Sequence, residues 1–150
     1  MSDLRDLYQE VILDHNKSPR NFYKLADANR VAEGFNPLCG DHIHVYLFLQ
    51  DDRIQDISFE GSGCAISKAS ASLMSSVLKG KSTDEAQKLF GHFHELVTTD
   101  QDTKGNTKEL GKLAVFSGVR EFPVRVKCAT LAWHTLQAAL EGKEQPVTTE

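Results

Sequence analysis

Three cysteines and one aspartate are the residues of this 150-residue chain whose types and spacing best suit metal and sulfur chemistry. Cys39 and Asp41 stand two positions apart in the turn Asn-Pro-Leu-Cys-Gly-Asp at 36–41, and Cys64 and Cys128 follow far along the chain. Three thiols and a carboxylate can complete a tetrahedral site for a borderline-soft cation, zinc first among them. We therefore predict a single metal site with these four ligands, in which Cys39 is the reacting sulfur.

Each of the three cysteines also has a plainer interpretation. Cys39 lies between proline and glycine, where an exposed loop is expected, but a packed thiol is an alternative. Cys64 begins a predicted helix, where amide groups and the helix dipole would lower the pKa of its thiol; it could equally be a small apolar residue facing a sheet. Cys128 shares an apolar stripe of the last helix and could belong to the core. The prediction depends on the three cysteines together.

Composition and charge limit the class of protein. The chain is 40% hydrophobic, which suits one domain over residues 1–150. The net charge of -4 argues against a nucleic-acid-binding surface. No apolar run is long enough to cross a bilayer and the first residues do not resemble a signal peptide, so we expect a cytoplasmic protein without membrane contact. An odd number of cysteines argues against a disulfide framework.

The hydrophobic pattern predicts an α+β domain in which a three-stranded antiparallel sheet packs against helices. A helix is expected at 3–15, a weaker strand at 29–36, and a hairpin of two strands at 41–49 and 54–60. Further helices are expected from Cys64 to about Gly80, after the capping box Ser-Thr-Asp-Glu at 82–85, and from Pro123 to Gly142. Residues 98–108 are expected to form an exposed loop, residues 110–119 short helical pieces, and residues 143–150 a flexible tail.

The charged residues around the cysteines have predicted secondary roles. Three thiolates and a carboxylate on a divalent cation carry a net charge of -2, which nearby positive charge would stabilise. Arg125 is the best candidate for this role and is predicted to act in the site, although an exposed basic helix start is the alternative. None of the six histidines has a spacing that pairs it with another as a metal ligand, but His42 is close enough to Asp41 to orient it.

Three separated motifs resemble those of the IscU-like iron–sulfur cluster assembly proteins. They are the turn at 36–41, Gly-Ser-Gly-Cys-Ala-Ile-Ser at 61–67 and Phe-Pro-Val-Arg-Val-Lys-Cys-Ala-Thr-Leu at 122–131, and the segment at 14–21 fits as well. Scaffold members of that family have histidine directly before the third cysteine, where this chain has Lys127. The segment between Cys64 and Cys128 is also longer than in scaffold members, with the insertion at 98–118. Both departures favour a similarity to the SufU branch.

The resemblance implies a function, a cofactor and partners. It implies a zinc-dependent sulfurtransferase in which Cys39, Asp41, Cys64 and Cys128 hold one zinc ion per chain. Cys39 would accept persulfide sulfur from a SufS-type cysteine desulfurase and supply downstream Suf assembly proteins. The alternative is a scaffold on which the same four side chains hold an iron–sulfur cluster.

Two further classes of protein agree less well with the residues. A purely structural zinc domain would favour Cys-x-x-Cys pairs, which the chain lacks. A cysteine hydrolase would need a base beside Cys39, and the sequence identifies none.

Overall fold

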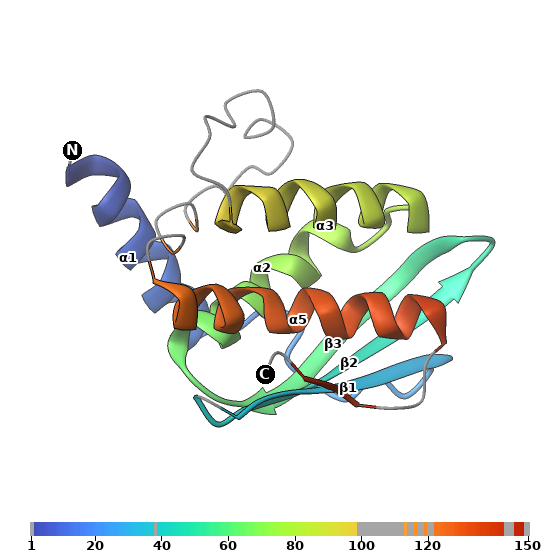
Figure 1. Ribbon diagram of the computed structural model, residues 1–150. Helices are drawn as coiled ribbons and strands as arrows, with labels where there is room; N and C mark the ends of the chain where they lie inside the picture. Colours follow the sequence, from blue (N-terminus) through green and yellow to red (C-terminus); the bar gives the residue numbers. More distant parts are fainter. Residues whose placement is uncertain are drawn as a thin grey trace.

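The computed structural model describes residues 2–37, 39–98, 113, 116, 119, 122–142 and 146–148. Its elements, in chain order, are α1 (Ser2–Lys17), β1 (Arg30–Asn36), β2 (Asp41–Gln50), β3 (Arg53–Ser62), α2 (Ala65–Leu78), α3 (Thr83–Thr98), α5 (Pro123–Glu141) and β4 (Val147–Thr148). The helices lie over one face of a single sheet, as Figure 1 shows. The predicted α+β class is therefore confirmed.

The sheet has four strands in the order β3-β2-β1-β4. The antiparallel pairs β1–β2 and β2–β3 form the meander that the alternating pattern predicts. β4 adds to the edge of β1 in parallel, with Val147 opposite Gly34 and Thr148 opposite Phe35. The prediction of three antiparallel strands was thus wrong, because two residues of what was expected to be a flexible tail complete a mixed sheet. A strand of two residues is too short to show a hydrophobic period.

Alternation along β2 separates an inner face from an outer face. Ile43, Val45 and Leu47 are buried beneath the helices, whereas His42 and His44 on the other face are half-buried. A register irregularity between Phe48 and Leu49 ends this alternation near the hairpin turn. Asp41, the first residue of β2, shares the inner face, so the strand directs its carboxylate toward the helices.

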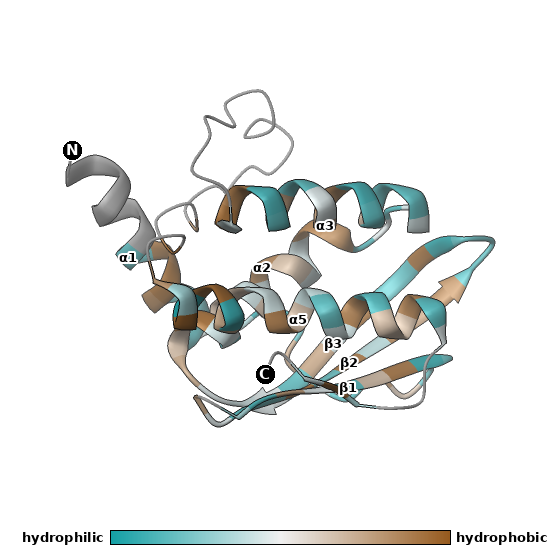
Figure 2. Cartoon of the chain, viewed as in Figure 1, coloured by the Kyte–Doolittle hydropathy of each residue, from teal (hydrophilic) through white to brown (hydrophobic). Residues whose placement is uncertain are grey.

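Two helices, α2 and α5, pack on this inner face, and the other two pack on them. α5 contacts β1, β2 and α2, while α2 also contacts β3 and α1, and α3 packs on α5. Figure 2 shows both brown and teal segments along α3 and α5, as expected for helices with one apolar and one polar side. Trp133 of α5 is fully buried and stacks on Phe93 of α3, so the aromatic core joins the last two helices.

Helix ends agree with the local signals in the sequence. In the predicted capping box, the Glu85 amide donates to Ser82 Oγ and the Ser82 amide to Glu85 Oε1, both at 3.1 Å. Pro123 occupies the first turn of α5, and Gly142 ends that helix with a φ of 72°. The exposed loop expected at 98–108 lies outside the described residues except for Thr98. Of the short helical pieces expected at 110–119, Leu113, Phe116 and Val119 are described; all have 3₁₀ conformation and are buried.

Candidate metal centre

Three separate segments bring the predicted ligands to one end of the sheet. Cys39 lies in the turn between β1 and β2, where Gly40 has a φ of 72° that favours glycine. Asp41 begins β2, Cys64 is the N-cap residue of α2, and Cys128 lies near the start of α5. Residues separated by up to 89 positions therefore meet where the sheet ends and two helices begin.

The ligand atoms of these residues are close together. Cys39, Asp41 and Cys128 each offer an atom within 4.8 Å of the other two. The sulfur atoms of Cys128 and Cys39 are 3.1 Å apart, well beyond the about 2.05 Å of a disulfide bond, so both are free thiols. Cys64 Sγ lies 3.9 Å from Asp41 Oδ2. The structure thus brings Cys39, Asp41 and Cys128 into one group, and Cys64 lies beside it, in contact with Asp41.

The donor set fits a zinc ion in chemical type and in spacing. Thiolate and carboxylate are both common zinc ligands. Ligand atoms on a tetrahedral zinc with bonds of about 2.0–2.3 Å lie roughly 3.3–3.8 Å from one another. The observed separations of 3.1 Å and 3.9 Å lie at either side of that range. A cation of this size could therefore be held with small side-chain movements.

Asn36, the first residue of the motif at 36–41, also belongs to this site. It is fully buried, and its Nδ2 donates to Asp41 Oδ2 at 3.1 Å and to Cys128 Sγ at 3.4 Å. Its Oδ1 is buried without a hydrogen-bond partner among the described residues. An amide that donates to two of the predicted ligand atoms positions both of them. Its place at the head of the motif was the signal available in the sequence.

Asp41 is also fixed from the side of α2. Its Oδ1 accepts a hydrogen bond from the Cys64 amide at 2.7 Å. Gly63 packs so closely that an added Cβ would lie 2.3 Å from that same oxygen. The glycine before Cys64 is therefore required by the close approach of the carboxylate, and a buried Asp41 joins β2 to the start of α2.

The pKa values of two thiols in the cluster are shifted in opposite directions. Contact with the Cys128 thiol and donation from the Ser67 and Ile66 amides lower the pKa of Cys64 to about 7, against the opposing effects of burial and of Asp41. Contact with Cys64, followed by burial and contact with Cys39, raises the pKa of Cys128. The cluster thus favours a thiolate at the start of α2 and keeps a proton on the buried thiol of α5.

Arg125 and His42 are the other two residues that the sequence predicts to act in this site. Arg125 is on the exposed first turn of α5, and its guanidinium lies 4.4 Å from the centroid of the Phe122 ring. The expectation that His42 orients Asp41 was wrong. Adjacent residues of a strand point to opposite faces, and His42 contacts Glu33 on the outer face. Sequence spacing alone missed this contact because it depends on the pairing register of two strands.

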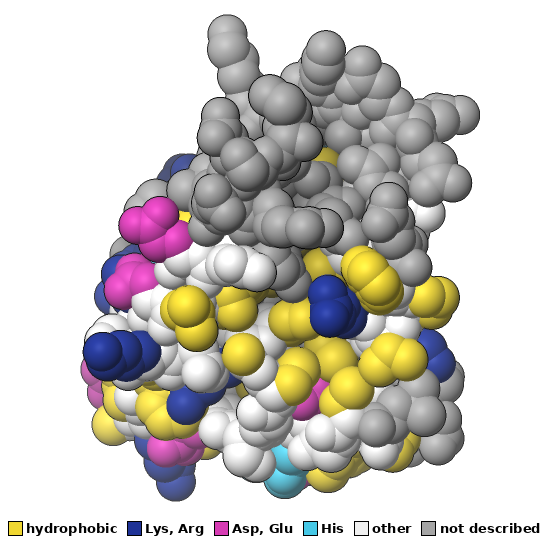
Figure 3. All heavy atoms as spheres, turned by 90° about the vertical axis from the view of Figure 1, so that its left-hand side faces the viewer, with side chains coloured by type: hydrophobic (Ala, Val, Ile, Leu, Met, Phe, Trp, Pro, Cys, Tyr) yellow, Lys and Arg dark blue, Asp and Glu magenta, His cyan; other side chains and the backbone are white. Residues whose placement is uncertain are grey.

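The end of the molecule that contains the centre has an exposed apolar surface. Figure 3 views the molecule from this end and shows hydrophobic side chains gathered at its middle, with few charged groups among them. Phe122 and Val124, at the first turn of α5, are 46% and 48% exposed. Exposed apolar side chains that lie close together are typical of a surface that binds another protein.

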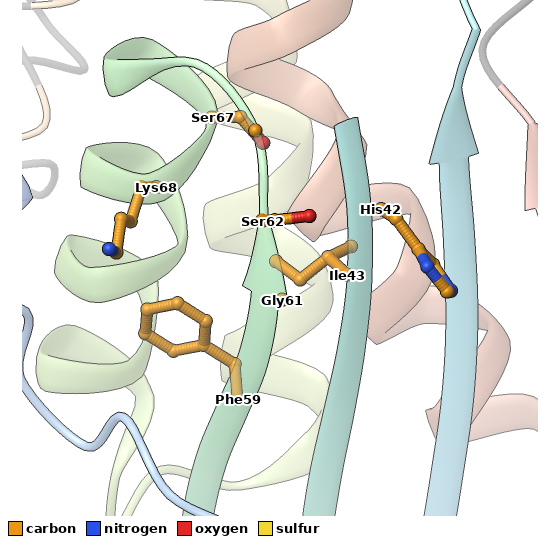
Figure 4. Close-up of a pocket in the computed structure, with 8 residues that line it drawn as sticks. His42, Ile43, Phe59, Gly61, Ser62, Ser67 and Lys68 are labelled. Carbon is orange, nitrogen blue, oxygen red and sulfur yellow. The ribbon is translucent and has the colours of Figure 1, made fainter. Parts of the chain in front are cut away.

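Beside the centre is a small hollow between the ends of β2 and β3 and the start of α2. It is lined by Phe59, Ser62, Gly63, Ser67 and Lys68, with His42, Ile43 and Gly61 (Figure 4). Lys68 Nζ lies 5.0 Å from the centroid of the Phe22 ring, so this cation already packs on an aromatic face. In the part of the chain that the structure describes, no helix is both long and apolar enough to cross a membrane.

Comparisons with known proteins agree with this geometry. Residues 7–129 match the family described as the NifU-like N-terminal domain. The chain is 40% identical over 141 residues to a Streptococcus pyogenes protein named iron-sulfur cluster assembly scaffold protein IscU, covering 94% of this chain and 87% of the relative. It is 38% identical over 143 residues to a Bacillus subtilis protein named zinc-dependent sulfurtransferase SufU, covering 95% of each.

A solved structure supports the same relationship. The crystal structure described as a putative iron-sulfur cluster assembly scaffold protein for the SUF system, from Fervidobacterium islandicum AW-1, superposes with a TM-score of 0.81 at 36% identity. The match covers 89% of this chain and 96% of that chain. The chain therefore belongs to the NifU-like N-terminal domain family, together with its relatives named IscU and SufU.

Proposed function

We propose that this protein accepts sulfur from a cysteine desulfurase for iron–sulfur cluster assembly, with Cys39 as the acceptor and one zinc ion held by Cys39, Asp41, Cys64 and Cys128. The observation that carries the proposal is the cluster of these side chains, in which Cys39, Asp41 and Cys128 offer ligand atoms within 4.8 Å of one another. The name of the Bacillus subtilis relative, a zinc-dependent sulfurtransferase, supports it.

Cys39 is the thiol best placed to react. It lies on a turn and is only partly buried, whereas Cys128 is 2% exposed in α5. Cys64 is occupied at the start of α2, where its sulfur accepts from the Ser67 amide at 3.4 Å. Bound zinc would keep the ligating sulfurs as thiolates at neutral pH. A partner can reach Cys39 without unfolding either helix.

The transfer is a thiol–disulfide type exchange at sulfur. The Cys39 thiolate attacks the terminal sulfur of the desulfurase's cysteine persulfide, forming a new sulfur–sulfur bond. The original sulfur–sulfur bond breaks, and its electron pair leaves with the desulfurase cysteine as a thiolate. Cys39 becomes the persulfide, and the oxidation state of the transferred sulfur does not change. No external oxidant or reductant is needed.

Arg125 is proposed to act at the docking surface. It stands in the same helical turn as the exposed Phe122 and Val124, three residues before Cys128. An exposed guanidinium stacked on Phe122 is available to a carboxylate of the desulfurase or to the negative charge of the persulfide. These contacts support a role for Arg125 in partner or substrate binding, in place of the charge stabilisation of the metal site that the sequence predicts.

The second candidate function is a scaffold for an iron–sulfur cluster. The Streptococcus pyogenes relative at 40% identity is named a scaffold protein, and three thiols with a carboxylate are also able to ligate iron. The two functions differ in the metal that the isolated protein holds and in the reaction that depends on Cys39.

Metal analysis and a desulfurase assay together separate the two functions. Protein purified without reconstitution should contain about one zinc per chain and no iron. A SufS-type cysteine desulfurase should turn over faster in its presence, and Cys39→Ala should abolish that stimulation. Arg125→Ala should raise the protein concentration needed for half-maximal stimulation, whereas the control Arg53→Ala, on the β2–β3 hairpin, should not. Stoichiometric iron with inorganic sulfide, or full stimulation by Cys39→Ala, would contradict the sulfur-acceptor function.

A further inference from the structure

A second group of potential metal ligands lies on the outer face of the sheet. Glu33 of β1 is directly opposite His44 of β2 in the strand register, and His42 is the next β2 residue on that face. Figure 4 shows His42 and Ile43 leaving β2 in opposite directions. Since Ile43 is buried under the helices, His42 and its neighbours point away from the thiol centre.

The three side chains converge on one point. Nε2 of His42 lies 2.5 Å, and Nε2 of His44 lies 3.3 Å, from the same carboxylate oxygen, Oε2 of Glu33. One ligand atom from each residue lies within 4.8 Å of the other two. Both imidazole rings therefore present the same nitrogen to a shared carboxylate, as ligands of a common cation would.

Neighbouring rings hold this arrangement. Phe35 stacks on His42, with centroids 4.3 Å apart and planes 17° apart. Tyr46 lies beside His44, with planes 15° apart, and its hydroxyl donates to Glu60 Oε1 at 2.7 Å. The side chains of the three ligands are 33–39% exposed, so an ion from solvent can reach them. A partly ordered and accessible set of ligands needs little rearrangement to bind.

The ligand types select the class of ion. Two imidazoles and one carboxylate suit divalent zinc, copper, nickel or iron, and leave coordination positions for water. Two ligand atoms about 2.1 Å from one tetrahedral ion lie roughly 3.4 Å apart, close to the observed separation of Glu33 from His44. The shorter contact with His42 would have to open by about 1 Å, which a small rotation of an exposed carboxylate achieves.

The geometry points to a second metal site, in which Glu33, His42 and His44 bind a divalent transition-metal ion on the face of β2 opposite the thiol centre. The occupied site carries a net charge of +1, whereas three thiolates and a carboxylate on zinc carry -2. With three protein ligands and no thiolate, the second site should be the weaker and more exchangeable of the two. It does not depend on the sulfur-acceptor function.

Zinc binding to matched variants tests this proposal. Protein that already contains its first zinc is titrated with Zn²⁺ by calorimetry and by equilibrium dialysis. The wild type should bind one more equivalent, and Glu33→Gln and His44→Ala should each weaken that step by about tenfold or more. Glu60→Gln removes the same charge from the same face, opposite His44 on β3. Its amide oxygen can still accept from the Tyr46 hydroxyl, so this control should leave the step unchanged. His94→Ala, an exposed histidine of α3, is the second control.

Three outcomes overturn the proposal: a wild type without the second equivalent, variants that bind it like the wild type, and equal weakening by Glu33→Gln and Glu60→Gln. The last result would mean that surface charge, and not ligation, attracts the ion. Circular dichroism of each variant establishes that it is folded, and if His44→Ala is not, Glu33→Gln carries the test. Because the comparison is between variants with the same thiol centre, the result stands even if that centre holds iron.

Discussion

At the scale of single residues, Asp41 is held from two sides. Asn36 donates to one carboxylate oxygen and the Cys64 amide donates to the other. Both donors also belong to the thiol cluster, since Asn36 reaches Cys128 Sγ and Cys64 is itself a predicted ligand. The orientation of the one oxygen ligand is therefore coupled to two of the three sulfur ligands, and changes beside the ligands should alter metal affinity.

Asn36→Ala should weaken zinc binding by about 10–100-fold, because it removes the donor that positions Asp41 and Cys128. It should also lower the free energy of unfolding by about 1–3 kcal/mol. Competition with a chelator of known affinity measures the first effect. Asn29→Ala is the matched control, because Asn29 also makes two side-chain hydrogen bonds, both to Leu49 at the other end of the sheet. Equal zinc affinity in the two variants would contradict the positioning role.

Gly63→Ala should damage the same site by a steric route. The new Cβ would meet Asp41 Oδ1 at 2.3 Å, so the carboxylate must move away from its present position. We expect a loss of about 2 kcal/mol or more in stability and a lower zinc content after purification. Gly91→Ala, in α3 with open space around it, should instead stabilise the protein by up to about 1 kcal/mol. A Gly63→Ala protein with wild-type zinc content and melting temperature would refute the close-packing argument.

How far the sequence predicts these sites depends on the kind of residue. The thiol cluster could be predicted because cysteine is rare and the four candidates stand in recognisable motifs. The group of Glu33, His42 and His44 could not, because it exists only through the pairing of Glu33 with His44 across two strands. Histidine and glutamate are ordinary residues on an exposed sheet face, so their types carry little information until the register is known.

At the scale of elements, α5 connects the metal centre to the aromatic core. Its first turns carry Cys128, and its middle carries Trp133 and His134, which pack against α3. Burial, followed by the nearby charge of His94, lowers the pKa of His134. The folded state therefore favours a neutral imidazole between the two helices.

This pKa shift predicts that the α3–α5 packing weakens in acid. A histidine whose folded pKa is lowered binds fewer protons than the unfolded chain near pH 6, so stability falls as the pH drops below the unfolded value of about 6.5. His134→Gln should make the free energy of unfolding less dependent on pH between about pH 7 and 5. Denaturant unfolding of both proteins at each pH, after chelation of metal, measures the difference. Parallel stability curves for the variant and the wild type would contradict the shift.

The strands show which elements local pattern can predict. The β1–β2–β3 meander follows from alternation and from the hairpin turn, whereas β4 follows from neither. Its two residues pair with Gly34 and Phe35 only because the end of α5 brings the chain back to the open edge of β1. Tertiary proximity, and not intrinsic strand propensity, makes this strand.

Removal of residues 146–150 should leave the fold intact but expose the β1 edge. We expect the amides around Gly34 and Phe35 to exchange with solvent faster, with a loss of stability of about 1 kcal/mol. Hydrogen exchange followed by mass spectrometry resolves this segment, and the β3 strand, at the other edge of the sheet, serves as the internal control. Unchanged exchange in β1 would show that β4 does not protect it.

At the scale of the whole molecule, the fold places the thiol cluster, an exposed apolar surface and the hydrophobic core next to one another. The thiol cluster forms where the sheet ends and two helices begin. The first turn of α5 presents Phe122, Val124 and Arg125 beside it, and Trp133 of the same helix is buried in the core. A partner that binds the exposed apolar surface would meet Cys39 on the same side. Zinc bound by residues from three segments distant in sequence should also stabilise the folded chain, because the unfolded chain lacks the assembled site.

The most direct test of the sulfur-acceptor function is the position of the transferred sulfur atom. The zinc-loaded protein is mixed with a SufS-type cysteine desulfurase and cysteine for a single turnover, the persulfides are alkylated, and peptides are mapped by mass spectrometry. The proposal predicts one additional sulfur on the peptide that contains Cys39, and none on those that contain Cys64 or Cys128. Sulfur on either of the latter, or none on the protein while the desulfurase turns over, would contradict it.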